Sequence, residues 1–304
     1  GFAMAILMII IASIAVFVNQ KLIGSRKSYA TIGGKGGRST LIGLGKVGRP
    51  VITAALFVFF AVGIIMPIVI LVMESFMLKE GIYSLDNFTL HYWIGESNPQ
   101  IMEGLPGIFK NDEFINSLFN SLRLTLVNGV FGTIFGQLLG YITAKGRGRL
   151  HGKLVEQLVF IPYLIPSVAF GGIYLSMFSQ PQQIFGVTLV PALYGTFALL
   201  TLVSVVKHLP FAARAGTSNM LQISGELEEA ATIEGAGFFR RFVKIVFPLS
   251  KGGFISGFML IFVSIMKELD LIILIMTPTT STLPYLAFRY HNGNSPQASD
   301  CEAS

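Results

Sequence analysis

Charge and cysteine are both scarce in this sequence, and each shortage excludes classes of protein. Of its 304 residues only 12% are charged while 52% are hydrophobic, a balance unlike that of a soluble domain. The single cysteine, Cys301, cannot form an internal disulfide. There is no CxxC or HExxH motif and the four histidines are scattered, so we expect no metal site. The composition indicates an all-α, polytopic integral membrane protein.

Apolar runs of membrane length recur along the chain. A helix needs roughly 20 apolar residues to cross the hydrocarbon core. The first run starts at residue 1 without a basic n-region or a small-residue cleavage site, so we interpret it as a span cut at its start and not as a signal peptide. We predict six spans, at about 2–19, 51–73, 118–144, 155–178, 188–206 and 254–276.

Basic residues concentrate in three segments between the predicted spans. Segments 20–50, 145–153 and 207–253 hold seven, four and six Lys or Arg residues, whereas segment 74–117 holds seven acids against Lys79 and Lys110. Basic loops stay in the cytoplasm, so the three basic segments are predicted to be cytoplasmic and the acidic one to lie outside. The net charge of +6 then reflects these loops, and we expect no nucleic-acid partner.

One charged stretch, EEAATIEGAGFFRRFVKIVFPL at 228–249, interrupts the apolar runs. Ser224 is suited to cap a helix, and acids that favour the helix dipole fill the first turn. These acids are Glu226, Glu228 and Glu229. Gly235 is placed to end this short helix, because glycine tolerates the left-handed conformation of a helix C-terminus.

A second short helix is predicted from Phe238 to Val246, where Pro248 stops it just before the next span. Phe238, Phe242 and Ile245 line one side of it, and the basic residues lie largely elsewhere. Two interpretations fit this pair of amphipathic helices. It could rest on the membrane with its basic side toward lipid head groups, or it could be a docking element for another protein.

The spacing within this stretch resembles the EAA loop of ABC-importer permeases. The matching residues are Glu229, Ala230, Ala231, Gly235, Ile245 and Pro248, and Phe247 stands where the family has Leu. The resemblance implies that the helix pair couples the chain to a cytoplasmic ABC ATPase dimer. ATP and Mg would bind to that partner, and this chain would have no cofactor and no catalytic residue. It would lie in the bacterial inner (plasma) membrane as a multi-pass protein.

The resemblance extends over about 51–290. It includes Asn120-Ser121-Leu122 and two prolines, Pro162 and Pro166, in FIPYLIPSVAFGG. Proline removes a helix hydrogen bond and kinks a span, which suits a helix that lines a gated path. A kink that serves packing alone is an equal alternative for either proline.

Three charged residues, Lys267, Glu268 and Asp270, fall inside the last predicted span. Each charge at mid-bilayer costs about 2.5–3.5 kcal/mol on insertion scales, so such residues face a bundle interior or an aqueous cavity. Lys267 and Asp270 are spaced to pair with each other, and Glu268 points elsewhere. Together with Pro162 and Pro166 they are candidates for the translocation path, with a structural interhelical ion pair as the alternative.

The leading span, the linker YATIGGKGGRSTLIGLG and the stretch YSLDNFTLHYW (83–93) resemble the C-terminal half of a ferric-iron-type fused permease. The glycine-rich part of the linker lacks the GxxxxGK[ST] spacing of a phosphate loop. We therefore predict the last span of a preceding permease unit at 1–19, a basic cytoplasmic linker at 20–50 and a permease transmembrane domain at 51–304. Because 277–304 is polar, this domain is predicted to lack its final helix.

The expected partners are the ATPase dimer, a periplasmic or extracellular substrate-binding protein, a second permease half or subunit, and membrane lipid. Ferric iron, thiamine, polyamine, sulfate and sugar all stay open as substrates. An ATP-independent carrier or channel is a competing interpretation, although it would not need a docking loop. A membrane enzyme would need clustered His, Asp or Ser at the end of a span, and the sequence has no evident cluster of that kind.

Overall fold

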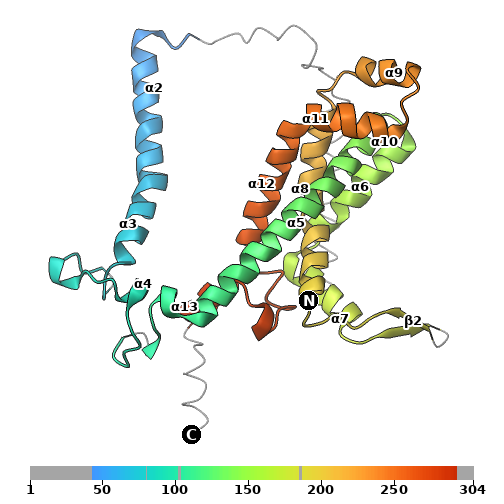
Figure 1. Cartoon of the computed structure of the whole chain (residues 1–304). Coiled ribbons are helices and arrows are strands. Elements are labelled where there is room, and N and C mark those ends of the chain that lie inside the picture. The colour runs from blue at the N-terminus through green and yellow to red at the C-terminus, as the bar shows by residue number, and fades with distance from the viewer. Residues whose placement is uncertain (1–42, 80, 102–103, 185–186, 293–304) are drawn as a thin grey trace. The chain divides into compact units, whose positions relative to one another are not determined.

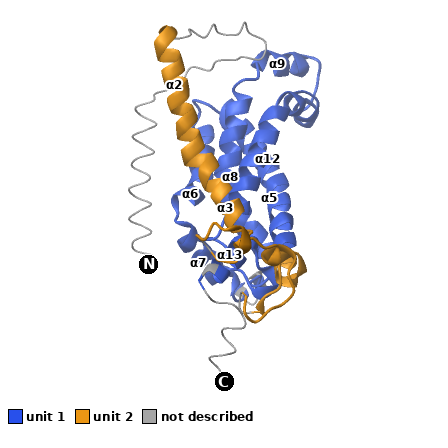
Figure 2. Ribbon diagram, turned by 90° about the vertical axis from the view of Figure 1, so that its left-hand side faces the viewer, with its two compact units in different colours: residues 1–36, 117–294 blue, residues 37–116, 295–304 orange. Residues whose placement is uncertain are grey.

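The computed structural model describes four stretches of the chain, residues 43–79, 81–101, 104–184 and 187–292. They divide into two compact units, with described residues 43–116 in one and 117–292 in the other (Figure 2). The predicted span at 2–19, and most of the predicted linker, lie outside the described residues.

The unit at 43–116 begins with a long apolar helix. Helix α2 (Gly45–Phe60) continues through a π-helical turn, η1 (Ala61–Ile65), into α3 (Met66–Glu74). Pro67, the second residue of α3, has no N–H for the helical hydrogen-bond ladder, which accounts for the irregular turn just before it. This helix is long and apolar enough to cross a membrane, and it contains the predicted span 51–73.

The rest of that unit is a folded segment of short elements. It contains η2 (Leu85–Asn87), α4 (His91–Ile94) and η4 (Ile108–Lys110). The buried side chain of Asn87 donates to the carbonyls of Lys79 and Ile82, at 2.7 and 2.8 Å. The ring of Trp93 stacks on Phe76, with 5.3 Å between centroids. The segment predicted to lie outside therefore has a packed structure of its own.

The unit at 117–292 is a helix bundle centred on α8 (Figure 1). Its helices are α5 (Asp112–Lys145, which starts in the other unit), α6 (Leu150–Leu164), α7 (Ser167–Phe178), α8 (Phe197–Met220) and α12 (Lys251–Met266). The core holds apolar side chains of α8 and α12 with those of the turn that follows α12. These include Leu199, Leu200, Val203, Ile261, Ile265 and Leu271.

Small residues bring α5 and α8 into close contact. A Cβ atom added at Gly136 would lie 2.3 Å from the Cβ of Ala212, and one added at Gly140 would lie 2.5 Å from the carbonyl carbon of Gly216. Both glycines and both partners are four residues apart, so each pair lies on one helix face. Helices in lipid associate through such stripes of small residues, because these let the backbones approach.

The predicted span 188–206 is wrong in position. Strands β1 (Gln182–Ile184) and β2 (Val187–Val190) pair antiparallel as a hairpin, and the helix begins at Phe197. The run VTLV is β-branched and short, and Pro191 and Gly195 separate it from the helix, whose first turn is capped by Thr196. Helix α8 then continues through 207–220, a segment predicted to be cytoplasmic.

Two further predicted spans are interrupted in the structure. The span at 155–178 is the pair α6 and α7, bent by 98°, and the span at 254–276 ends as a helix at Met266. Within the described part of the chain, three helices are long and apolar enough to cross a membrane, or up to five if each bent pair counts as one span. The fold is helical and polytopic, as predicted, with one small hairpin.

The remaining elements lie at the two ends of the bundle (Figure 1). At one end lie α9 (Gly225–Ile233), α10 (Phe238–Arg241), η5 (Phe242–Val246) and α11 (Phe247–Leu249). At the other end lie the hairpin, η6 (Pro278–Thr280) and α13 (Leu283–His291). The loop after α5 is at the same end as α9, because Lys145 contacts Glu228. Two of the predicted cytoplasmic segments thus meet.

Candidate functional site

The first short helix of the charged stretch is built as its sequence predicts. The Ser224 hydroxyl accepts a hydrogen bond from the backbone N–H of Glu226 at 3.4 Å. Gly235 has a φ of +77°. The N–H of Gly235 donates to the carbonyl of Thr232 and the N–H of Ala236 to that of Ala231, each at 2.9 Å. This pair of bonds is the Schellman motif, which confirms that Gly235 ends the helix.

The second helix of the stretch runs without interruption from Phe238 to Leu249, three residues beyond its predicted end. Pro248 is its penultimate residue, and the π-helical turn just before α11 fits the N–H that proline lacks. The Ser250 hydroxyl then donates to the carbonyl of Phe247 at 3.0 Å. At Ser250 the chain bends by 76° into α12, so the loop is joined directly to a helix of the bundle.

A buried carboxylate fastens this loop to the bundle. Glu228 is 8% exposed, and its carboxylate accepts a hydrogen bond from the Tyr141 hydroxyl at 2.7 Å and pairs with the Lys145 ammonium at 2.5 Å. The Tyr141 ring also packs edge-on against the rings of Phe238 and Phe242, with centroids 5.6 and 5.7 Å apart. We call Tyr141, Lys145 and Glu228 the surface tether. It holds α9 and the second helix against the end of α5.

The opposite side of the loop is exposed and rich in apolar groups. Ile233 is 86% exposed and Phe239 is 80% exposed. We call this side the outer face; its residues are Leu227, Glu229, Ala230, Ile233, Phe239 and Val243. Glu229 and Ala230 of the EAA pattern lie on it, whereas Ala231 and Ile245 are half-buried. Exposed apolar groups of this size on a tethered loop favour a protein contact.

A second group of candidate residues lies inside the bundle: Lys207 and His208 of α8, and Glu268, which pairs with His208. Lys207 is 7% exposed and His208 is 3% exposed, near the middle of a 24-residue helix. The Nε2 atom of His208 lies 3.5 Å from a carboxylate oxygen of Glu268, and its Nδ1 atom lies 2.9 Å from the carbonyl oxygen of Ser204. We call Lys207, His208 and Glu268 the polar cluster.

Both ring nitrogens of His208 face acceptors. Both bonds form only when the ring carries two protons or the Glu268 carboxyl carries one. Glu268 also accepts a hydrogen bond from the backbone N–H of Leu271 at 3.2 Å. His208 and Glu268 therefore satisfy each other and nearby backbone groups within the bundle, as buried polar groups must.

The predicted path residues Pro162 and Pro166 flank the bend between α6 and α7. The Lys207 ammonium donates to the carbonyl of Pro162 at 3.0 Å and to the carbonyl of Ile165. The final carbonyls of a helix have no partner within the helix. Lys207 supplies one, and it also lies 5.3 Å from the centre of the Phe170 ring on α7. Sequence reasoning found this bend but missed its cation.

Lys267 and Asp270, the other two path candidates, lie apart from the polar cluster. Both are exposed, and the described residues include no ion pair between them, contrary to the pairing expected from their spacing. The reason is local: the helix ends at Met266, so the spacing of three residues no longer places them on one helix face. Glu268 points away from them, as predicted, and toward α8.

The motif Asn120-Ser121 fastens the opposite end of the bundle. The Asn120 amide donates to the carbonyls of Thr279 and Ser281 at 3.1 and 3.0 Å, and the Ser121 hydroxyl accepts from the backbone N–H of Leu283 at 2.8 Å. The turn around η6 and the start of α13 are thus held to α5. This motif has a structural role here, with its side chains turned to backbone groups.

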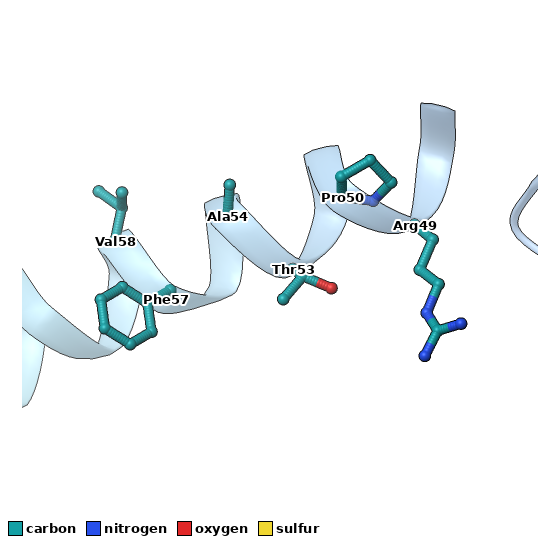
Figure 3. A pocket seen from close by; sticks show the side chains of 6 residues that line it. All are labelled: Arg49, Pro50, Thr53, Ala54, Phe57 and Val58. Carbon is teal, nitrogen blue, oxygen red and sulfur yellow. The ribbon is translucent and has the colours of Figure 1, made fainter. Parts of the chain in front are cut away.

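A shallow hollow on α2 offers no comparable site (Figure 3). Its lining comes from one helix and includes a single charge: Arg49, Pro50, Thr53, Ala54, Phe57 and Val58. A ligand site needs depth and polar groups that converge from several elements. Among the described residues there is also no group of three His, Cys, Asp or Glu side chains that could hold a metal ion.

The fold and these sites together define a class: a polytopic helical membrane protein with interrupted spans and a tethered loop at one end of the bundle. Residues 136–299, more than half of the chain, match the family described as the binding-protein-dependent transport system inner membrane component. The chain belongs to this family.

Relatives within the family are named for the transport of different substrates. The chain is 26% identical to the sulfate transport system permease protein CysT of a Synechocystis species, over 56% of this chain and 57% of CysT. It is 23% identical to the ferric transport system permease protein FbpB of Actinobacillus pleuropneumoniae, over 94% of this chain and 39% of FbpB. The chain thus spans well under two thirds of either relative.

The fold also occurs in solved structures. A chain of a bacterial ABC transporter involved in the import of alginate superposes with a TM-score of 0.56 at 17% identity, covering 82% of this chain and 85% of that one. A chain of the bacterial alginate transporter in complex with an alginate pentasaccharide-bound periplasmic protein gives 0.59 at 16% identity, covering 81% and 83%. At these identities the likeness shows the fold.

Proposed function

We propose that this chain is a permease subunit of an ATP-driven importer, and that the loop at 224–249 docks it to a cytoplasmic ATPase dimer. The observation that carries the proposal is the outer face: a strongly exposed apolar surface on a loop that the surface tether holds at the end of the bundle. ATP and Mg belong to the ATPase, and this chain supplies the path and the mechanical contact.

The loop is suited to transmit force. The Schellman motif fixes the turn between its two helices, and the second helix continues through one bend into α12. A displacement of the outer face therefore acts on a helix of the bundle through a short folded segment. The positive-inside rule supports a cytoplasmic location for this end, because the basic loop after α5 lies beside the surface tether.

Ferric iron is the substrate we propose. In its support, FbpB matches 94% of the chain, while the sulfate relative CysT matches 56%. The further partners that we propose for this chain are a second permease half and a substrate-binding protein outside the membrane. Iron would be cargo delivered by that binding protein, so a resident metal site on this chain is not required. Sulfate, sugar, thiamine or polyamine are the alternatives that the substrate test separates.

The docking test changes the outer face and leaves the surface tether alone. The variant Ile233→Asp with Phe239→Asp is co-expressed with the second permease half and its ABC ATPase, and the assembled complex is isolated in detergent. We expect the variant to reach the membrane normally but to lose most of the co-purifying ATPase, because two charges replace exposed apolar contacts.

Leu85→Asp is the matched control, because Leu85 is an apolar residue 90% exposed in the other unit. This control should retain the ATPase. Normal ATPase recovery with the double variant would reject the docking role. Uptake that continues without any ATPase would instead support the ATP-independent carrier or channel.

The substrate test measures ATP hydrolysis by the reconstituted complex with its own binding protein. Binding protein loaded with ferric iron should stimulate hydrolysis, and the same protein without ligand, or offered sulfate or thiamine, should not. Stimulation by one of the other ligands and not by iron would change the proposed substrate to that ligand. The proposed role as a permease would stand.

A further inference from the structure

Two interrupted helices end close together inside the bundle, and the polar cluster lies where they meet. Helix α12 has 16 residues and so rises about 24 Å, less than the roughly 30 Å of the hydrocarbon core. Helix α6 has 15 residues before the 98° bend to α7. The carbonyl ends of such half-helices carry partial negative charge. In this protein the Lys207 ammonium faces one of these ends directly and Glu268 follows the other.

Helices α8 and α12 are fastened to each other at two levels. Near the loop, the Asn219 amide of α8 donates to the carbonyl of Ser250 at 2.9 Å, at the bend that leads into α12. Inside the bundle, His208 of α8 meets Glu268, just after α12. Apolar side chains of both helices pack in one core between these levels. The two helices therefore form a firmly joined pair, connected through the bend to the loop.

The bend between α6 and α7 depends on this pair for its polar contacts. Among the described hydrogen bonds, both that run from α8 to the bend come from the Lys207 ammonium. Helix α7 also packs closely on the turn after α12, since a Cβ atom at Gly171 would lie 2.9 Å from the carbonyl oxygen of Leu271. A shift of α8 and α12 would therefore pull directly on the carbonyls of the bend.

We propose that Lys207 is the positioning residue that links movement of the α8–α12 pair to the bend between α6 and α7, and so couples the docking loop to the path. The ammonium is a cation fixed on a side chain at a site where two backbone carbonyls would otherwise be unpaired in an apolar core. Without it the α8–α12 pair can move while the bend does not follow. This inference rests on the proposed function, because it needs a partner that drives the loop.

The test follows the bend itself. Cys301 is the only cysteine of the sequence, so Cys301→Ser gives a background for spin labels. Labels on the exposed residues Leu154 of α6 and Ile173 of α7 report the geometry of the bend. The distance between them is measured in the full reconstituted complex, nucleotide-free and vanadate-trapped. We expect a change of distance on trapping in the parent protein and no change in Lys207→Met, which keeps the apolar stem and removes the charge.

Transport gives a second readout on the same variant. We expect Lys207→Met to assemble and to hydrolyse ATP. The amount of substrate moved per ATP should fall about tenfold or more, a factor typical of coupling between two sites. Lys79→Met is the control, because Lys79 is an exposed lysine in the other unit. That control should behave as the parent does.

Chemical rescue keeps the test decisive if Lys207→Met assembles poorly. Lys207→Ala leaves space for n-propylammonium, which replaces the atoms beyond Cβ, and this amine should restore part of the coupling while n-propanol should not. A bend that moves normally in Lys207→Met, or uptake per ATP that stays unchanged, would overturn the inference. If the parent complex binds no ATPase at all, the proposed function fails first.

Discussion

Two glutamates make similar ties to partners in very different surroundings. Glu228 joins the loop to α5 through the Tyr141 hydroxyl and the Lys145 ammonium, and 34% of the Lys145 side chain is exposed. Glu268 joins the turn after α12 to α8 through His208, whose side chain is only 4% exposed. The first tie lies at the end of the bundle and the second lies within it.

Because of this difference, the loss of a partner should lower the free energy of unfolding by different amounts at the two carboxylates. Water can reach the partners of Glu228 and solvate a charge left without its counterpart. Lys207 and His208 are only 7% and 3% exposed, so a polar group of theirs left without its partner has little access to water. We therefore expect the surface tether to open more readily than the polar cluster.

The largest effect is expected from Glu268→Ala. The change leaves two groups without their partner, the Nε2 atom of buried His208 and the backbone N–H of Leu271, at about 1–3 kcal/mol each. The free energy of unfolding, measured by titration from mild detergent into SDS, should fall by the sum of these two costs. Asp270→Ala is the control, since Asp270 is exposed two residues away. Equal losses for both variants would contradict the burial argument.

A smaller effect is expected at the surface tether. Hydrogen bonds to charged groups contribute about 1.5–3 kcal/mol, so Tyr141→Phe and Glu228→Gln should each destabilise the loop by less than Glu268→Ala destabilises the bundle. A double-mutant cycle of the two variants should show clear coupling between them, read as protease resistance of the loop. Strictly additive losses would mean that the 2.7 Å contact contributes nothing.

Gly235→Val tests the turn of the loop without touching its packing. A Cβ at this position meets nothing within 4 Å, so the cost comes from the left-handed backbone alone and is about 1–2 kcal/mol. We expect weaker ATPase binding and coupling, with membrane insertion and the unfolding of the bundle unchanged. Gly235→Asn is the milder control, since Asn tolerates this conformation. Full ATPase coupling in the Val variant would show that docking does not depend on the turn at Gly235.

The smallest effect is expected at the far end of the bundle. Asn120→Ala removes two hydrogen bonds to backbone carbonyls, at about 0.5–1.5 kcal/mol each. The SDS titration should show a modest loss of stability, and the coupling ratio should not change. If Asn120→Ala lost as much coupling as Lys207→Met, general loosening of the bundle would explain the loss in both variants. No specific role of Lys207 would then be needed.

The sequence predicted best what depends on neighbours along the chain. The cap at Ser224 and the helix end at Gly235 are decided within four or five residues, so the charged stretch could be interpreted correctly. The broken span at Pro162 and Pro166 was also visible, because proline acts on its own helix. The orientation of the loops, which we inferred from the count of basic residues, stays a prediction.

What depends on distant residues was missed. Lys207 and His208 were assigned to a cytoplasmic segment, because their partners are carbonyls 42 and 45 residues away and a carboxylate in the turn after α12. The strand run 187–190 was merged with the following helix, since a short apolar run fits either element. The stripe of Gly136 and Gly140, four residues apart, was a readable sign of close packing that the span count passed over.

The ammonium that Lys207 presents to the end of α6 has one more consequence. Transporters with interrupted helices often place free sodium ions or protons at such ends, and those ions travel down their own gradients with the cargo. A positive charge bonded to the chain cannot leave, so it can return to the same carbonyls in every cycle. Under the proposed function, transport would then need no sodium or proton gradient, and its energy would come entirely from the nucleotide.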